Sequence, residues 1–229
     1  MTVLSVVQDV SRQLRLAVPT VLFAGTDQFS KTMQALVNES ATAIAKAHDW
    51  RKFTTLKTQA GDGSTTSFSL PNDYDRMPVK AQIFLTSTTR PMAKIDDLDV
   101  WQENRLQSIS NPGGEWMILS GSLQIYPAMS ASDSAKYYYQ TNLIVTSASD
   151  ATTFTVDTDT FKLPERLLKL DLIWRFLAGI GMDYTEDMRN SEIALSQEIA
   201  RDKGSRIIKV GMARMPSDVE LAYPGTIDA

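Results

Sequence analysis

The sequence predicts an α+β protein: a four-helix bundle with a mainly β insert between the second and third long helices, plus an extended C-terminal arm. Apolar residues recur at helical spacing near both ends of the chain. The middle instead holds Thr-rich and aromatic runs separated by glycine turns, which is typical of strands. We therefore expect helical halves at 1–52 and 161–204, a β-rich insert at 53–160 and an arm at 205–229.

The N-terminal half should contain two helices. The first has an apolar stripe at Val3, Val7, Val10 and Leu14, with Thr2 or Ser5 as its N-cap. The second should begin near Thr26 and Asp27 and end near Trp50, and its stripe includes Phe29, Met33, Leu36, Val37, Ile44 and His48.

The central segment indicates two hairpins and further strands. One hairpin is expected around Gly61-Asp62-Gly63 and another at Ser120-Gly121. Residues 78–87 and 135–147 should be strands, the latter with Tyr137 and Tyr139 on one face and Tyr138 on the other. Between them we expect a short helix at 95–107, with these residues facing inward: Ile95, Leu98 and either Val100 or Trp101.

The stretch 158–184, "TDTFKLPERLLKLDLIWRFLAGIGMDY", predicts a third long helix that is apolar on nearly every side. Pro164 should lie just inside its start, and Gly179 and Gly181 mark its end. Only two thin polar strips interrupt its surface, so other elements must cover most of it. A narrow-striped fourth helix, from Thr185 to near Gly204, can supply part of that cover.

A neighbouring subunit should cover the remainder. The residues expected to pack in the core and between subunits are Leu170, Trp174, Phe176 and Leu177. The residues of the arm expected to contact a partner are Ile207, Ile208, Val210 and Met212.

Composition excludes several classes of protein. The 229 residues carry a net charge of -4, which disfavours gripping nucleic acid or coating an anionic membrane. There is no cysteine, so disulfides, thiolate metal sites and cysteine nucleophiles are impossible. The N-terminus lacks the pattern of a signal peptide, and charged residues interrupt the best candidate for a membrane span, residues 163–182. We therefore expect no membrane association.

Asp157 and Asp159 are the strongest candidates for a metal site. Two carboxylates one residue apart resemble the paired aspartates of haloacid-dehalogenase-like phosphatases and of metal-dependent glycosyltransferases. The phosphatase pattern, however, requires Thr or Val where this chain has Phe161, and it requires an alternating βαβ order. The favoured interpretation is a polar loop that leads into the helix at Pro164.

Other candidates for catalysis have equally plain structural interpretations. His48, the only histidine, should be a partly buried structural residue. Ser120-Gly121-Ser122 lacks the setting of a nucleophile elbow, and Glu165 and Asp171 do not share a helix face as a glycosidase pair would. The strand aromatics could stack bases or sugars but lack accompanying basic residues; they are Phe68, Phe84, Tyr137, Tyr138 and Tyr139. We expect no enzyme activity, no metal and no cofactor.

An ordered set of landmarks resembles the head-to-tail adaptor (connector) proteins of tailed bacteriophages. The landmarks are "VVQDVSRQLRLAVPTVLF", "HDWRKF", "FSLPNDYDRM", "GSLQIYPA" and "TDTFKLPERLLKLDLIWRFLAGIGMDYTED". They span about residues 3–204 in order, and the arm after 205 lies outside them.

The resemblance implies a structural protein of the virion neck, assembled in the host cytoplasm. It implies a ring of twelve copies that docks under the portal, extends the DNA channel and gives tail or nozzle proteins a platform. The helical part would build the ring, the β unit would project outward or toward the tail, and the arm would reach the portal or a neighbour. Double-stranded DNA would pass through the lumen without sequence-specific binding, since an acidic wall repels phosphates.

Two alternatives remain open from the residues alone. One is a cell-wall or carbohydrate-active domain, associated with a phage tail, that uses the β unit with Asp157 and Asp159. The other is a generic peptide-binding module with exposed strands. Hydrolysis of peptidoglycan would favour the first, and a stable monomer would favour the second.

Overall fold

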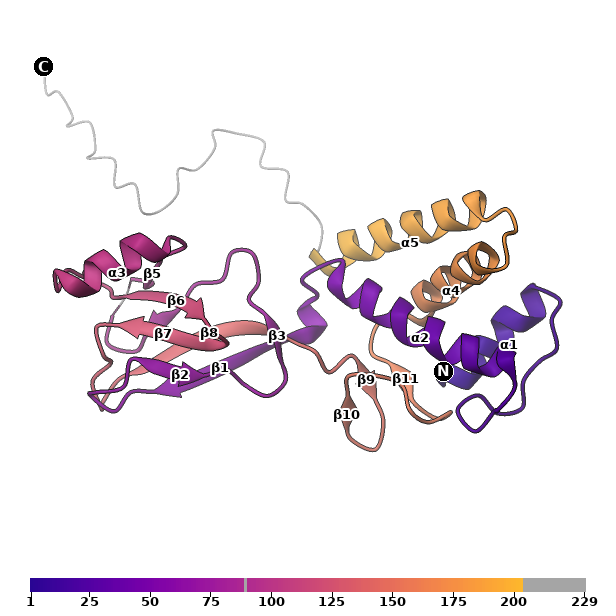
Figure 1. The fold of residues 1–229 in the computed structure, drawn as a ribbon, viewed down its shortest axis with the longest axis horizontal. Helices are drawn as coiled ribbons and strands as arrows, with labels where there is room; N and C mark the ends of the chain where they lie inside the picture. The colour runs from indigo at the N-terminus through magenta and orange to yellow at the C-terminus, as the bar shows by residue number, and fades with distance from the viewer. Residues whose placement is uncertain (89, 204–229) are drawn as a thin grey trace, which may run out of the picture.

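The computed structural model describes residues 1–88 and 90–203, and it confirms the α+β class. Figure 1 shows an elongated molecule with a helical lobe at one end and a β lobe at the other. The helical lobe contains α1, α2, α4, α5 and a small sheet, and the β lobe contains two larger sheets and α3. The predicted arm, with Ile207, Ile208, Val210 and Met212, lies outside the described residues.

Five α-helices and one short 3-10 helix form within the described residues. Their bounds are α1 Val3–Gln13, α2 Gln28–Lys46, η1 Arg51–Phe53, α3 Leu98–Leu106, α4 Glu165–Gly179 and α5 Thr185–Lys203. Thr2 caps α1 and Asp27 caps α2 through side-chain oxygens that accept backbone N–H groups, as predicted. The second helix ends four residues before Trp50, and Pro164 is the N-cap of α4 rather than its first residue.

Helix α4 lies at the centre of the helical lobe. Its main helix contacts are with α1, α2 and α5, which surround it on different sides. Its apolar positions all round the axis are therefore covered largely within one chain: Leu167, Leu168, Leu172 and Ile173 are buried. A four-helix bundle is not confirmed, because the outer helices each contact α4 more than one another.

The β lobe is built from two four-stranded sheets. The first sheet has the order β1-β8-β3, with β4 also paired to β8; the second has the order β2-β7-β6-β5. The strands of the first sheet are β1 Thr54–Ala60, β3 Tyr74–Arg76, β4 Phe84–Leu85 and β8 Ser134–Thr141. Those of the second are β2 Ser67–Ser69, β5 Ala93–Lys94, β6 Glu115–Leu119 and β7 Ser122–Tyr126. All pairs are antiparallel except β5 with β6.

The inner faces of the two sheets share one core. Leu123 and Ile125 of β7 alternate with more exposed neighbours, and they pack in one cluster with Tyr137 and Tyr139 of β8. Tyr138 points to the other face of β8 and is exposed, so the predicted alternation along this strand is confirmed.

Only one of the two predicted hairpins forms. Strands β6 and β7 pair directly across Ser120 and Gly121, both of which have positive φ, as a tight hairpin turn requires. The hairpin predicted at Gly61–Gly63 is wrong, because β1 pairs with β8 and β2 pairs with β7. Asp62 accepts the N–H groups of Ser64 and Thr65 there, so the chain turns from one sheet into the other.

Helix α3 is confirmed, but its buried face is narrower than predicted. Trp101 is buried, whereas Leu98 and Val100 are exposed. The buried carboxylate of Glu115 on β6 accepts the side-chain amides of Asn104 and Asn111, which ties α3 to the sheet. The strand predicted at 78–87 is reduced to the two residues of β4.

A third, small sheet belongs to the helical lobe. Its strands are β9 Val145–Thr146, β10 Asp150–Ala151 and β11 Thr160–Phe161. Val145, Phe154 and Phe161 join the same apolar cluster as the four helices, so part of the predicted insert packs with the helices. The domain boundaries at residues 52, 160 and 204 stay a prediction. None of the helices in the described part of the chain has the length and hydropathy of a membrane span.

Candidate assembly interface

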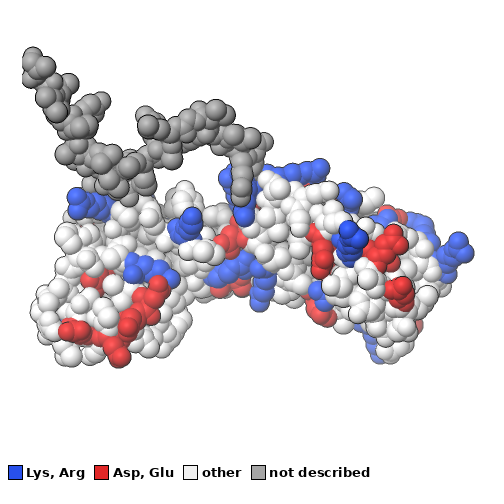
Figure 2. Space-filling model, turned by 90° about the horizontal axis from the view of Figure 1, so that it is seen from above, with Lys and Arg blue, Asp and Glu red and all other residues white. Residues whose placement is uncertain are grey.

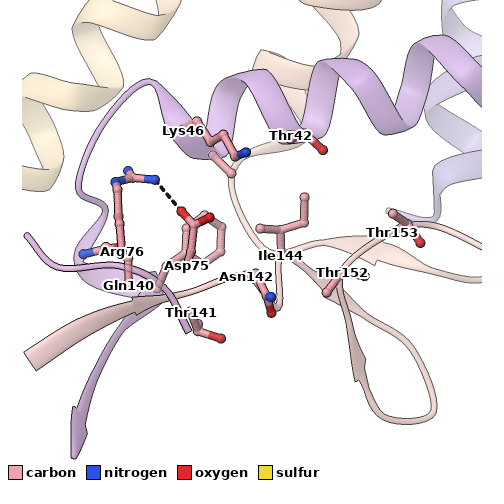
Figure 3. A pocket seen from close by; sticks show the side chains of 12 residues that line it. Thr42, Lys46, Asp75, Arg76, Gln140, Thr141, Asn142, Ile144, Thr152 and Thr153 are labelled. Carbon is pink, nitrogen blue, oxygen red and sulfur yellow. Dashed lines mark hydrogen bonds and ion pairs between the residues drawn. The ribbon is translucent and has the colours of Figure 1, made fainter. Parts of the chain in front are cut away.

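The two lobes meet at a polar junction centred on Arg76. From β3, its guanidinium contacts the Asp49 carboxylate at 3.1 Å and donates to the backbone carbonyl of His48 at 2.9 Å. It also pairs with Asp75 at 2.7 Å (Figure 3). Asp49 in turn accepts the backbone N–H of Val79. One arginine therefore links the chain after α2 to the first sheet of the β lobe.

A cavity of about 290 Å³ lies beside this junction. Figure 3 shows that side chains from both lobes line it: Thr42 and Lys46 of α2, Asp75 and Arg76 of β3, and Gln140 to Asn142 at the end of β8. Polar groups surround it, but no cluster of three metal-ligating side chains occurs among residues 1–88 and 90–203. The side chains that line this cavity do not form a recognisable set of catalytic groups.

His48 has the structural role predicted for it. Its ring packs edge-on against Trp50 with centroids 5.1 Å apart, and Nε2 lies 3.3 Å from a carboxylate oxygen of Asp202 near the end of α5. Asp202 also accepts the backbone N–H of Arg51. The end of α5 is thereby held against the segment that joins the lobes.

Replacing Arg76 with methionine is expected to weaken the junction, because Asp49 and Asp75 lose their charged partner. The free energy of unfolding should fall by about 1–2 kcal/mol, as for other charge-assisted hydrogen bonds. Hydrogen exchange of the amides in 49–54 and 74–79 should become faster. Arg189→Met, at an exposed site on α5, is the matched control and should change neither quantity. Equal rates of amide hydrogen exchange in the Arg76 and Arg189 variants would contradict the assigned role of Arg76.

The turn between α4 and α5 forms an apolar surface at the end of the helical lobe. Ile180 and Met182 are 53% and 58% exposed, and Tyr184 and Met188 are also exposed. We call these four residues the α4–α5 corner. Trp174 packs beside them, with its ring 6.1 Å from that of Tyr184. Its indole N–H donates to Asp171, so the polar edge of the ring is satisfied and its orientation is fixed.

The four predicted packing residues of α4 differ in exposure. Phe176 and Leu177 are buried within this chain, and Phe176 packs edge-on against Phe29 of α2. Leu170 and Trp174 are only partly covered. Two of the four thus contribute to the core of the single chain, while a role between subunits stays a proposal for all of them.

Asp157 and Asp159 both bind backbone N–H groups. The Asp157 carboxylate accepts from Leu22 and Phe23, which anchors the loop between α1 and α2. The fully buried Asp159 accepts from Thr155 and Val156 at 2.8 and 2.9 Å. Each carboxylate therefore fixes a loop, which agrees with the favoured interpretation of this segment as a polar loop before α4.

The remaining candidates for chemistry also have structural partners. Asp171 accepts from Trp174 and Arg175, and Arg175 reaches Glu39 on α2. Burial and the hydrogen bond to Asp73 raise the pKa of Tyr139 to about 12, so its hydroxyl stays protonated. Tyr137 is buried beside it. Of the three consecutive tyrosines, only Tyr138 is free to contact a ligand.

The model of one protein family, described as SU10 adaptor protein, matches residues 1–220. The chain belongs to this family. The match confirms the resemblance to phage head-to-tail adaptors and extends beyond residue 204, where the quoted landmarks ended. A search of curated proteins found no match. A structural adaptor family suggests a non-enzymatic role and a component of the virion.

Two features of the adaptor were missed from the sequence. The junction of Arg76 with Asp49 brings together residues 27 positions apart, and no periodic pattern signals it. The α4–α5 corner was visible as "GIGMDY", since three large apolar or aromatic residues at a helix turn are unusual in a solvated loop. The glycines in this stretch predict only the end of a helix.

Proposed function

We propose that this adaptor is a non-enzymatic ring subunit of the phage neck that docks under the portal. The ring would have twelve copies, extend the DNA channel and provide the platform for tail or nozzle proteins. Membership of the adaptor family supports this proposal. The observation that carries it is the α4–α5 corner, where apolar side chains are exposed at the end of the helical lobe.

The ring contact would use this corner together with Leu170 and Trp174. Large exposed apolar groups that lie together mark interaction surfaces. Trp174 suits such a surface, since aromatic residues with satisfied polar edges are frequent at interface centres. Phe176 and Leu177 would support the contact from beneath.

The surface charge is compatible with a channel that DNA crosses without binding. The net charge of the chain is -4. On the face drawn in Figure 2, acidic and basic side chains are interspersed, and an acidic group lies at the end of the β lobe. The visible part of this face shows no continuous basic stripe of the kind that grips phosphates.

Deleting residues 205–229 is expected to leave a folded protein that no longer docks on portal particles. The reason is that Ile207, Ile208, Val210 and Met212 are the proposed contact residues of the arm. Circular dichroism would check folding, and negative-stain images of mixtures with portal particles would check docking and ring symmetry.

A shorter deletion, of residues 217–229, keeps those four residues and is the matched control. It should retain docking. Docking by the protein that lacks 205–229 would refute the role of the arm, and stained particles without a ring would refute the assembly.

The cell-wall alternative has no observation in its favour among the described residues. Asp157 and Asp159 are bound to backbone N–H groups. Release of soluble fragments from peptidoglycan by the purified chain would nevertheless favour it over the structural role.

A further inference from the structure

The outer face of the first sheet carries an open apolar groove. Its apolar lining consists of Leu56 on β1, Phe84 on β4, Tyr138 on β8 and the nearby Pro78 and Ala81. The charged lining consists of Lys80, Lys136 and Asp49, whose carboxylate is already paired with Arg76, and the volume of the groove is about 570 Å³. We call it the β-lobe groove.

The apolar residues of the groove form a continuous set. Leu56 and Tyr138 are direct cross-strand partners, and they are 51% and 55% exposed. Phe84 pairs with Lys136, two residues from Tyr138 on the same face of β8. The opposite face of this sheet is already buried in the core of the β lobe, so a solvent-facing side would be expected to be polar. Because the outer face of this sheet is also apolar, we expect another segment or a partner to cover that face.

The C-terminal segment begins beside this groove. Asp202 and Lys203, at the end of α5, lie around the same surface hollow as Pro78, Val79 and Lys80. That hollow and the β-lobe groove share Pro78 and Lys80. An extended chain advances about 3.3 Å per residue. The residues after 203 are therefore long enough to reach any part of the groove.

One part of this segment has the composition that the groove requires. In "SDVELAY", residues 217–223, Val219, Leu221 and Tyr223 alternate with Asp218 and Glu220. Such alternation places the apolar side chains on one face of an extended chain and the acidic ones on the other.

The charges of the segment and the groove are complementary. Neither Lys80 nor Lys136 forms an ion pair with another residue of 1–88 or 90–203. Lysine side chains are long enough to extend past the edge of a bound segment, so these two ammonium groups can reach acidic side chains on its outer face. The earlier part of the C-terminal segment carries Arg206, Lys209 and Arg214, and would be repelled.

We propose that residues 217–223 dock in cis on the β-lobe groove. Val219, Leu221 and Tyr223 cover Leu56, Phe84 and Tyr138, and Asp218 and Glu220 pair with the two lysines. A tether that starts beside the groove gives the segment an effective concentration in the millimolar range, so docking within one chain precedes docking between chains. A partner that takes either the segment or the groove must first separate them.

The absence of cysteine allows a direct test in the full-length chain. Thr58→Cys lies on the outer face of β1 opposite Lys136, and Ala222→Cys lies within the segment. A short bismaleimide should link these two positions within one chain. The matched control pairs Ala222→Cys with Leu106→Cys, at an exposed site of α3 elsewhere on the β lobe.

The pair with Thr58→Cys should react at least about tenfold faster than the control pair, and its rate should not change on dilution. Adding Lys136→Glu should slow the reaction, and Glu220→Lys should restore it. Equal rates for both pairs would overturn docking on the groove. A product that is a covalent dimer and disappears on dilution would place the segment on a second copy and overturn docking in cis.

Discussion

Replacing Leu172 with alanine is expected to destabilise the free protein by about 2–5 kcal/mol. Leu172 is fully buried on α4, the helix that α1, α2 and α5 surround. Removing its side chain leaves a cavity that the helices can close only in part. Urea unfolding followed by circular dichroism measures the loss.

The same experiment separates the core of one chain from contacts between chains. Ile180→Ala, just beyond the end of α4, removes a side chain that is exposed in the single chain. It should change the free energy of unfolding by less than about 0.5 kcal/mol. The midpoint for the unaltered protein should not depend on protein concentration, because α4 is covered within one chain. A midpoint that rises with concentration, or an equal loss in both variants, would show that the fold itself requires a neighbour.

Replacing Asp159 with asparagine is expected to lower the free energy of unfolding at neutral pH. It should also make the free energy of unfolding depend less on pH in the acid range. Burial alone raises the pKa of Asp159, but hydrogen bonds outweigh it and the net pKa lies below its ordinary value of 3.8. The N–H groups of Thr155 and Val156 donate to this carboxylate, and the nearby side chains of Ser147 and Thr155 also lower its pKa. The carboxylate thus favours the folded state whenever it is ionised.

The sign of the pH dependence follows from this lowered pKa. The contribution of Asp159 is complete above the unfolded pKa, near 3.8, and is lost as the pH falls through the lower pKa of the folded state. Asp159→Asn should cost about 1–3 kcal/mol at pH 7, because the two N–H groups lose a charged acceptor. Between pH 5 and pH 2 the variant should lose less stability than the original protein.

Urea unfolding at a series of pH values tests this prediction. Glu192→Gln is the matched control, since it removes a carboxylate from an exposed position on α5. Its pH profile should parallel that of the unaltered protein. If Asp159→Asn gave the same parallel profile, the carboxylate would not be coupled to folding.

Local features of this chain were predictable because nearby residues determine them. Thr2 and Asp27 cap the helices that follow them, and the positive φ angles of Ser120 and Gly121 close a hairpin between adjacent strands. The alternation of Tyr137, Tyr138 and Tyr139 requires only the period of a strand. The order of the landmarks along the chain was sufficient to indicate the adaptor family, and the match to residues 1–220 confirms it.

Long-range pairing was not predictable, because it depends on residues far apart in the sequence. Strand β1 pairs with β8, so Thr54 lies opposite Gln140, and the turn at Gly61–Gly63 does not close a hairpin. The link from Asp157 to the N–H groups of Leu22 and Phe23 has the same origin. Neither contact leaves a periodic pattern in the sequence.

The sequence by itself therefore determined which segments are helices, which strands alternate, and which family the chain belongs to. Only the tertiary structure decided what covers the apolar helix at 165–179, because a helical wheel counts apolar faces without identifying their neighbours. Three helices of the same chain bury most of that surface. The exposed apolar groups lie instead at the α4–α5 corner and on the β-lobe groove, where packing within the described residues leaves them uncovered.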